Sequence, residues 1–304
     1  MIKRILIIGS GSIAKKHQKV LNNISNNIKL LIIPTRKINQ YKQKDFNGLI
    51  TFDPEYILVC SPSTYHYKHF QLIEKFFKRK TVLIEKPLFS NYRKLKNKFK
   101  NQYFIGYNLR FHPIIKFVKN YIKGKKIYFA KVYCSSYLPN WRKEKNYSNT
   151  VTSNKNLGGG VLLELSHELD YLLWIFKKIK ILNVVNKKVS DLKINTDDIL
   201  SLNGMAVGKT LINLTINFFS RIQNREIFID GKNFSLHANI LKNSISLVEG
   251  KKKKNLKFKK FNMQKTYTNE NLSIINRNFR DICTIKEGID LLKLISKIKK
   301  KNEN

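Results

Sequence analysis

The 304-residue chain is poor in cysteine and has no long apolar run, and each shortage excludes a class of protein. Cys60, Cys134 and Cys283 lie far apart without paired spacing, which argues against a disulfide framework or a zinc site and favours a reducing compartment. No apolar stretch approaches the roughly 20 residues that cross a bilayer. The apolar run near the N-terminus is too short for a signal peptide. We therefore expect a cytoplasmic protein with no membrane span.

Acidic residues are also scarce, because 20 Asp and Glu face 59 Lys and Arg, for a formal net charge of +39. Such an excess normally indicates a polyanionic partner, and Lys251 to Lys254 and Lys297 to Lys301 resemble basic patches. Only ten of the basic residues are arginine, however, and arginine is the residue favoured for base reading and phosphate clamping. Lysine spread over every segment is typical of a solvated surface. We expect salt-sensitive adhesion to polyanions but no specific nucleic-acid partner.

A glycine-rich turn near the N-terminus is the most informative segment. The branched run Ile5 to Ile8 predicts a buried strand, and the next six residues, GSGSIA, match the spacing of a dinucleotide-binding turn. Gly9 allows a tight turn, Gly11 lets the backbone approach a pyrophosphate, and Ala14 lets the following helix pack on the strand. The amides that begin this helix would face the phosphates. The predicted cofactor contacts here are Gly9, Ser10, Gly11, Ser12 and Ile13.

The type of dinucleotide depends on the end of the second predicted strand, Ile28 to Pro34. An acidic residue at this place would hold the adenosine ribose hydroxyls. The sequence instead has Arg36, which pairs with a ribose phosphate through charge-assisted hydrogen bonds. The cofactor is therefore expected to be NAD(P), with NADP favoured over NAD.

Two further strands, Tyr56 to Cys60 and Thr81 to Ile84, alternate with helices and predict a parallel sheet with right-handed crossovers. Ser61 and Pro62 follow the first of them and are expected to contact the cofactor. His66, close to this strand end, is an expected cofactor contact, with a solvated helix residue as the alternative. His69 is expected to be a solvated helix residue.

The combined motifs resemble the Gfo/Idh/MocA family, named after glucose-fructose oxidoreductase, inositol dehydrogenase and MocA. The motifs are GxGxIAxxH, then SPxxxH after one strand, then EKP after the next, followed by GYNLRFHP and GGGVLLELSHELDYL. The resemblance implies an N-terminal Rossmann domain, expected over residues 1–112, and a second α/β domain with an open, mostly antiparallel sheet, expected over residues 113–304.

The second half of the sequence supports that architecture independently. Alternating patterns predict strands, and turn signals such as VGK and DGKN favour hairpins. Two closing helices are expected over 271–284 and 287–299. An open sheet leaves one face to cover, so we expect a homodimer or homotetramer. The predicted strands are 126–136, 181–189, 199–206, 210–219 and 225–230.

Catalysis is assigned to Lys86 and His167. Lys86 follows a strand at the carboxyl edge of the sheet, where a partly desolvated amine beside the nicotinamide exchanges a proton with a substrate hydroxyl. The resemblance places the family's lysine here and a histidine acid/base at His167. Glu164 departs from the family pattern, in which an aspartate stands four residues before the histidine. It either orients His167, binds a sugar hydroxyl or only lies on the helix. Asp170 is either a site residue or a structural carboxylate.

The remaining site assignments come from loops. Glu85 and Asn108 are expected to contact the cofactor, and Tyr107, Asn108 and Arg110 to line nicotinamide or substrate, with an interface ion pair as the alternative for Arg110. Trp141 and Arg142 suit a stacked sugar ring and a guanidinium contact, or else are a packed loop aromatic and a surface cation. An acid and a histidine three residues apart also suit iron or zinc, but no second pair follows Glu164 and His167, so no metal is expected.

Together these assignments predict an NAD(P)-dependent oxidoreductase acting on a sugar or sugar derivative, with nucleotide-linked sugars of surface-polysaccharide metabolism included. Hydride would pass between the substrate carbon and nicotinamide. The alternative is a non-catalytic regulator of the same fold that senses a dinucleotide or sugar. A nucleic-acid-binding protein is a third hypothesis, which rests on charge alone and lacks a recognition motif.

Overall fold

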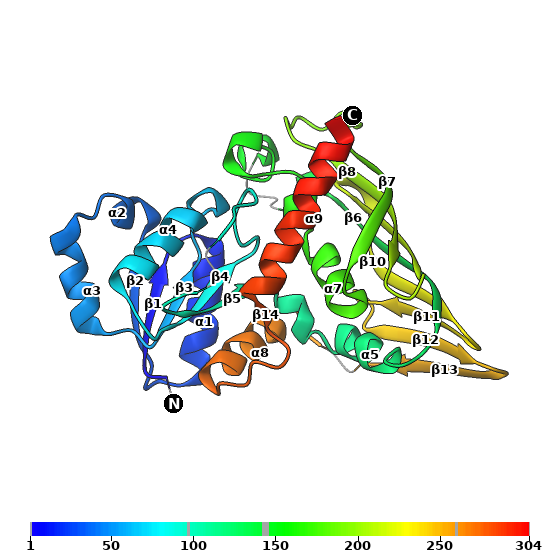
Figure 1. Ribbon diagram of the computed structural model, residues 1–304, viewed down its shortest axis with the longest axis horizontal. Helices are drawn as coiled ribbons and strands as arrows, with labels where there is room; N and C mark the ends of the chain where they lie inside the picture. Colours follow the sequence, from blue (N-terminus) through cyan, green and yellow to red (C-terminus); the bar gives the residue numbers. More distant parts are fainter. Residues whose placement is uncertain (1, 96–97, 142–145, 259–260, 304) are drawn as a thin grey trace. The chain divides into compact units, whose positions relative to one another are not determined.

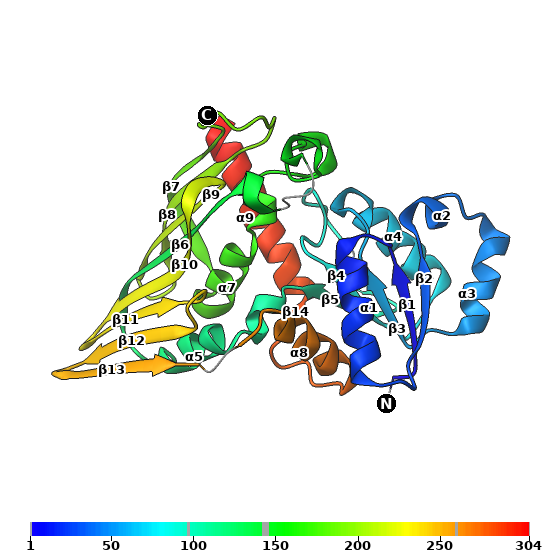
Figure 2. The ribbon, with the colours of Figure 1, turned by 180° about the vertical axis from the view of Figure 1, so that it is seen from behind.

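In the computed structural model, which describes residues 2–95, 98–141, 146–258 and 261–303, the chain divides into two compact units (Figures 1 and 2). The first comprises Met1–Phe111 and Met263–Leu292, and the second comprises His112–Asn262 and Lys293–Asn304. The sequence-based division at residue 112 assigns residues 263–292 to the second domain, whereas in the structure they pack with the first. Residues 263–292 pack with the first unit because the apolar side chains of Ile274, Ile275 and Ile282 join the core that surrounds β1 (Arg4–Ile8).

The first unit alternates strands and helices, as the apolar runs predict. The helix predicted over 271–284 is displaced, because α8 ends at Ile275 and a short strand follows. After β1, the elements are α1 (Ser12–Ile24), β2 (Lys29–Ile33), α2 (Thr35–Asn39), α3 (Phe46–Phe52), β3 (Tyr56–Val59), α4 (Ser63–Phe76), β4 (Thr81–Glu85), β5 (Gln102–Gly106), α8 (Gln264–Ile275), β14 (Cys283–Thr284) and the start of α9 (Ile285–Glu303), with 3-10 turns at Gln43–Asp45 and Asn108–Phe111.

The sheet of this unit has the order β14-β5-β4-β3-β1-β2. The strands β1 to β5 are parallel, and β14 runs antiparallel to β5. Helices α1 and α8 pack together on one face, whereas α4 lies against the other (Figures 1 and 2). Strands buried on both faces explain the unbroken apolar runs of β1 and β3. The predicted doubly wound Rossmann architecture is confirmed.

The second unit is built on a larger sheet with the order β13-β12-β11-β10-β6-β9-β8-β7. Its elements are α5 (Pro113–Tyr121), β6 (Ile127–Tyr137), α6 (Val161–Glu164), α7 (His167–Phe176), β7 (Ile179–Lys187), β8 (Ile199–Ala206), β9 (Leu211–Asn217), β10 (Phe219–Gly231), β11 (Phe234–Asn239), β12 (Ser244–Glu249), β13 (Lys252–Lys257) and the end of α9, with 3-10 turns at Leu138–Trp141, Tyr147–Asn149 and Lys155–Leu157.

Hairpins connect β8 with β9 and β10 with β11, as the VGK and DGKN turns predict. The β6–β9 pair is parallel, and the other pairs among the described strands of this sheet are antiparallel. Helices α5 and α7 lie on one face of the sheet (Figures 1 and 2), and α6 contacts β8 and β9. The predicted open, mostly antiparallel sheet is therefore confirmed.

The lysine tract from Lys251 to Lys254 enters β13, the edge strand of this sheet. Lysines on an edge strand discourage pairing with another chain, because pairing would bring charge into the new sheet. The fold thus gives this tract a role that does not involve a polyanion. Among the described residues, no helix is both long and apolar enough to cross a bilayer.

Candidate functional site

The carboxyl ends of the parallel strands gather the predicted cofactor residues at one edge of the first sheet. The β1, β2 and β3 ends lie in register, since Ile8 aligns with both Ile33 and Val59, and Glu85 aligns with Gly106 at the ends of β4 and β5. In open α/β sheets, ligands bind at this edge, where the strand order reverses on either side of β1. The predicted contacts that directly follow these strand ends are Gly9 to Ile13, Arg36, Ser61, Pro62, Lys86 and Asn108.

Two glycines of the turn after β1 are required for different reasons. Gly9 has φ +122°, and a Cβ there would lie 2.7 Å from the carbonyl carbon and oxygen of Cys60. Gly11 has φ −73°, and a Cβ there would meet nothing within 4 Å. The fold itself therefore demands glycine at position 9 but not at position 11, and the approach of a ligand to the backbone at Gly11 stays a prediction.

The helix after this turn is arranged as the pattern predicts. Ala14 is buried against the β1 core, and Gly11 caps the helix without a side-chain hydrogen bond. The first turn of α1 carries no acidic side chain, and Ser10 and Ser12 are exposed. The first amides of a helix lack partners within the helix and carry partial positive charge. These amides suit a diphosphate.

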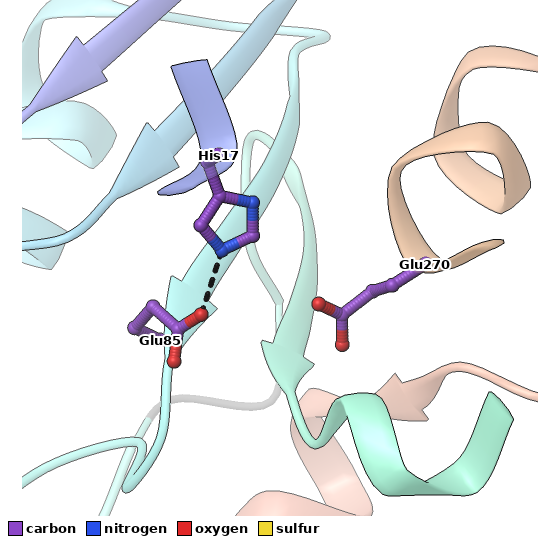
Figure 3. Close-up of side chains that lie close together, drawn as sticks. All are labelled: His17, Glu85 and Glu270. Atoms are coloured by element: carbon purple, nitrogen blue, oxygen red, sulfur yellow. Dashed lines mark hydrogen bonds and ion pairs between the residues drawn. The ribbon is translucent and has the colours of Figure 1, made fainter. Parts of the chain in front are cut away.

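Glu85 lies in a buried hydrogen-bond network rather than on an open surface (Figure 3). Its Oε1 accepts from Nε2 of His17 at 2.8 Å, and its Oε2 accepts from the backbone N–H of Lys86 at 3.1 Å. Asn271 Nδ2 donates to Nδ1 of His17 at 2.9 Å, and Tyr56 donates its hydroxyl proton to Asn271 Oδ1. The network fixes the main chain at Lys86, and the predicted contact of Glu85 with a cofactor stays a prediction.

The sequence reasoning did not find this network, although its first member was visible. His17 ends the run GxGxIAxxH, which served only as a motif of the family resemblance and gave this histidine no role. Glu270 and Asn271 belong to α8, which is about 250 residues away, so no local pattern linked them to His17.

Within the described residues, His17, Glu85 and Glu270 are the one group whose ligand atoms are close enough for a metal ion, all within 4.8 Å of one another (Figure 3). The hydrogen bonds oppose metal binding. Asn271 Nδ2 donates to the Tyr267 carbonyl, which fixes the orientation of this amide. Since an amide nitrogen only donates, Nδ1 of His17 accepts from it, and the imidazole proton resides on Nε2. A metal ion would need the lone pair of Nε2. Metal-ligating histidines normally donate a hydrogen bond from their other ring nitrogen, whereas Nδ1 of His17 accepts one. The three side chains therefore suit a proton on Nε2 of His17 better than a metal ion.

His66 joins the loops after β3 and β4. It is buried, with Nδ1 2.9 Å from the Pro87 carbonyl oxygen and Nε2 2.8 Å from the Ser61 carbonyl oxygen. Burial lowers its pKa, although both carbonyls act in the opposite direction. These contacts exclude the solvated alternative for His66 and show that it joins the two loops. The predicted cofactor contacts of His66, Ser61 and Pro62 stay predictions.

His69 is buried, and the expectation of a solvated residue is wrong. Nδ1 lies 2.9 Å from the Ser61 hydroxyl and Nε2 lies 3.1 Å from Oδ1 of Asn39. The apolar spacing of α4 did not reveal this, because its partners come from other segments. Burial, together with the nearby charges of His66 and Lys68, lowers the pKa of His69 to about 4.

This pKa predicts a pH dependence of stability. The unfolded chain binds a proton at His69 near pH 6.5, whereas the folded protein does so only near pH 4, so folding is disfavoured as the pH falls through this window. The loss attributable to His69 approaches about 3 kcal/mol. We expect the His69→Gln variant to lose less stability between pH 7 and pH 4.5 than the parent, measured by urea unfolding. The control, His237→Gln on the second sheet, should keep the parental slope; equal slopes for parent and His69→Gln would contradict the assignment.

Asn108 and Arg110 are both buried beside β5. Asn108 Nδ2 donates to the Thr266 hydroxyl at 2.6 Å, and Arg110 Nη1 pairs with Glu287 Oε1 at 3.0 Å. Tyr107, which precedes them, is also buried. The ion pair lies within the first unit, so Arg110 has a structural partner there, and its predicted contact with substrate stays a prediction. Arg36 is exposed just beyond β2, as a group awaiting a ribose phosphate would be.

In the second unit, two of the three glycines before His167 make room for neighbouring segments. A Cβ at Gly159 would overlap the carbonyls of Val151 and Thr152, and a Cβ at Gly160, which has φ +109°, would overlap the carboxylate of Asp197. Asp197 Oδ2 accepts from the amide of Leu162 at 2.9 Å and so caps α6. The sequence reasoning missed this aspartate, because it approaches from 35 residues farther along the chain.

The residue spacing predicts a helix with Glu164 and His167 on one face and Asp170 slightly round from it, but in the structure this helix is interrupted. Glu164 ends α6 and His167 begins α7, and between them Ser166 donates its hydroxyl proton to the carbonyl of Leu163 at 2.8 Å. Such a side-chain bond competes with helical pairing. Thr152 donates to Glu164 Oε1 at 3.1 Å, His167 is half-buried, and Asp170 is buried in the first turn of α7. Because the helix is interrupted at Leu165 and Ser166, His167 is the first residue of α7.

Trp141 ends a 3-10 turn with its indole 39 % exposed. Nε1 donates to the Ser136 hydroxyl at 2.9 Å and the ring packs edge-on against Phe218. Part of the Trp141 side chain therefore packs against the protein and part is exposed to solvent. Its contact with a sugar stays a prediction. Arg142 lies outside the described residues.

Comparison with known proteins supports the family resemblance. Residues 3–101 match the model of the Gfo/Idh/MocA family, described as an oxidoreductase family with an NAD-binding Rossmann fold. No curated protein matches the chain. The resemblance predicted from the motifs is confirmed.

Solved structures extend the likeness in fold to the whole chain. The WlbA dehydrogenase from Bordetella pertussis, solved with NADH and UDP-GlcNAcA, covers 100% of this chain and 97% of its own at 15% identity and a TM-score of 0.75. A levoglucosan dehydrogenase solved with NADH covers 99% and 97% at 14% identity and 0.80. A super-repressor mutant of Gal80p from Saccharomyces cerevisiae covers 100% and 96% at 14% identity and 0.78.

Proposed function

We propose that this chain, whose residues 3–101 form an NAD-binding Rossmann domain of the Gfo/Idh/MocA oxidoreductase family, is an NAD(P)-dependent dehydrogenase or reductase of sugar CH–OH groups. The bound nicotinamide supplies hydride transfer. Lys86 and His167 hold and move the hydroxyl proton and stabilise charge on the substrate oxygen. Glu85 and His17 fix the main chain at Lys86.

The observation that carries the dinucleotide part of the proposal is Gly11. It lies at the carboxyl edge of the sheet, is exposed, has an ordinary φ, and has open space where a Cβ would stand. A pyrophosphate resting on the first amides of α1 accounts for a glycine that the fold does not need.

The choice between the dinucleotides follows from Arg36. We propose that this exposed arginine, which stands where an acidic residue would hold ribose hydroxyls, favours NADP over NAD. We expect NADPH to raise the melting temperature more than NADH at equal concentration in a thermal-shift assay, and Arg36→Ala to remove the difference. Equal shifts for both cofactors in the parent would overturn the NADP preference without touching the enzyme proposal.

The substrate class follows from the relatives and from the loops of the second unit. WlbA was solved with a nucleotide-linked sugar and the levoglucosan dehydrogenase is named for a sugar derivative, which supports a sugar substrate here. We propose that Glu164 and Trp141 contact the sugar, Trp141 through the open part of its indole. A screen of sugars and nucleotide sugars for nicotinamide oxidation or reduction tests this assignment.

A regulator is the second candidate, because a protein named as a super-repressor mutant shares the fold. A regulator would be stabilised by dinucleotide and sugar without turnover of any candidate, and replacing Lys86 or His167 would not alter its binding. Turnover that depends on both residues distinguishes the enzyme.

We also propose that the chain self-associates through the open face of the second sheet. Inward residues such as Val132 and Leu214 are fully buried, whereas the alternate residues Phe129 and Tyr133 are half-buried and Leu211 is 47 % exposed. A second copy would cover the apolar side chains of this face, which Lys131 and Asn213 interrupt. We expect a dimer or tetramer by light scattering and dissociation in Leu211→Glu. The control Val207→Glu, in the β8–β9 turn and 68 % exposed, should leave the mass unchanged; a monomeric parent at high concentration refutes the proposal.

A further inference from the structure

A buried ion pair lies next to the predicted acid/base. Glu168 directly follows His167 in the first turn of α7, and its Oε1 is 2.7 Å from Nε of Arg225 on β10. The side chain of Glu168 is 0 % exposed and that of Arg225 is 17 % exposed. The pair thus joins the helix that begins at His167 to the interior of the large sheet.

Arg225 is a firm anchor because its strand is held on both sides. It stands opposite Cys134 in the β6–β10 ladder, and its carbonyl accepts from the amide of Ile240 at 2.9 Å. It also follows the register shift between Phe219 and Asn224, which re-aims side chains along β10. The guanidinium therefore projects from a fixed point of the sheet.

The surroundings of the pair are apolar enough to make either charge alone unfavourable. Burial, followed by the charge of Glu168, raises the pKa of the Cys134 thiol and of the Tyr171 phenol. In such surroundings an ion pair adds little stability over well-packed apolar side chains, whereas loss of one partner leaves an uncompensated charge. Stabilisation of the fold is therefore a weak explanation for this buried ion pair. The position that it gives to the start of α7 is a better one.

The start of α7 needs such an anchor. The residue before the helix, Ser166, makes no side-chain capping hydrogen bond to it, and its hydroxyl donates backward to Leu163. Consecutive helical residues are separated by about 100° and 1.5 Å, so fixing Glu168 also fixes the direction in which His167 leaves the helix.

We propose that the Glu168–Arg225 pair sets the position of His167, which makes both members positioning residues for the reaction. This inference rests on the proposed function. It concerns how the imidazole is held, and the pair itself touches neither substrate nor cofactor. Misplacement of a reacting group by about 1 Å costs about 100-fold in rate.

The test compares four variants: Glu168→Gln, Arg225→Lys, Arg225→Met and the neutral double variant Glu168→Gln/Arg225→Met. We expect each to lower kcat about 10- to 100-fold with KM changed less than about threefold, and Arg225→Lys to retain more activity than Arg225→Met. NAD(P)H affinity, a property of the first unit, should be unchanged. Hydrogen exchange of a peptide spanning residues 161–170 should accelerate about tenfold.

The double variant separates positioning from stability. Since it leaves no unpaired buried charge, it should regain the melting temperature lost in Arg225→Met but not the lost kcat. Recovery of both would overturn the proposal, as would parental kcat and parental exchange of residues 161–170 in Glu168→Gln. Glu249→Gln, which breaks the exposed pair with Lys125, is the control and should change neither readout.

Failure of the proposed function would be visible separately. A parent protein that turns over no sugar refutes the enzyme assignment, while exchange at residues 161–170 still decides whether the pair holds the turn that begins α7. Unchanged exchange there in Glu168→Gln and Arg225→Lys would refute the positioning role whatever the parent's activity.

Discussion

Replacing Gly9 by alanine is expected to destabilise the protein by about 3 kcal/mol and to abolish dinucleotide binding. The residue has φ +122°, and the added Cβ would lie 2.7 Å from the Cys60 backbone. Backbone strain of this kind and overpacking each contribute roughly 1 to 3 kcal/mol. Because the clash is with the main chain of Cys60, just after β3, relief requires movement of that segment or of the turn. Urea unfolding measures the stability, and quenching of tryptophan or enhancement of NAD(P)H fluorescence measures the binding.

Gly11→Ala is the matched control, because the same methyl group meets no protein atom within 4 Å. The φ of −73° is ordinary for alanine, so stability should change by less than about 0.5 kcal/mol. Binding should nevertheless weaken at least about tenfold, since the methyl group occupies the path of the pyrophosphate. Full binding by Gly11→Ala would remove the main support for the dinucleotide proposal.

Replacing Lys86 by methionine or His167 by asparagine is expected to lower kcat by about 100- to 10,000-fold, the range typical of a lost proton-transfer group. NAD(P)H affinity should stay within about threefold of the parent's. Under the proposed function, in which the two groups serve one proton transfer, the double variant should be little worse than the more damaged single variant. Stopped-flow measurement of nicotinamide absorbance with the best substrate from the sugar screen gives these rates.

Two controls accompany these variants. Lys78→Met removes an exposed lysine just before β4, and His237→Gln removes a histidine from the second sheet. Both should keep parental kcat. Parental turnover in Lys86→Met would show that the EKP lysine serves only the fold, and loss of dinucleotide binding in the same variant would show that Lys86 holds the cofactor rather than the proton.

Repeating apolar runs and glycine positions predicted much of the fold. The strands β1, β3 and β4 fall where the runs lie, and the VGK and DGKN turns gave the hairpins of the second sheet. The strands β5, β11, β12, β13 and β14 are not among the predicted ones, and in β13 (KKKNLK) the lysines leave no apolar alternation to detect. The break between Glu164 and His167 escaped too, because the residues around it are all compatible with a continuous helix.

The buried polar contacts were beyond reach of the sequence. His17 and Asn271 are 254 residues apart, and Glu168 and Arg225 are 57 apart, with no periodicity relating the members of either pair. The same holds for His69, whose burial depends on Asn39 and Ser61 from other segments.

The sequence by itself determined the alternation of strands and helices in the first half, the glycine turn and the candidate lysine and histidine, because these depend on local periodicity and on spacing along the chain. Only the tertiary structure decided why Gly9 must be glycine, that residues 263–292 return to the first unit, and which charged side chains are buried together. Those properties depend on contacts between distant segments, and such contacts form only when the apolar surfaces of the elements pack.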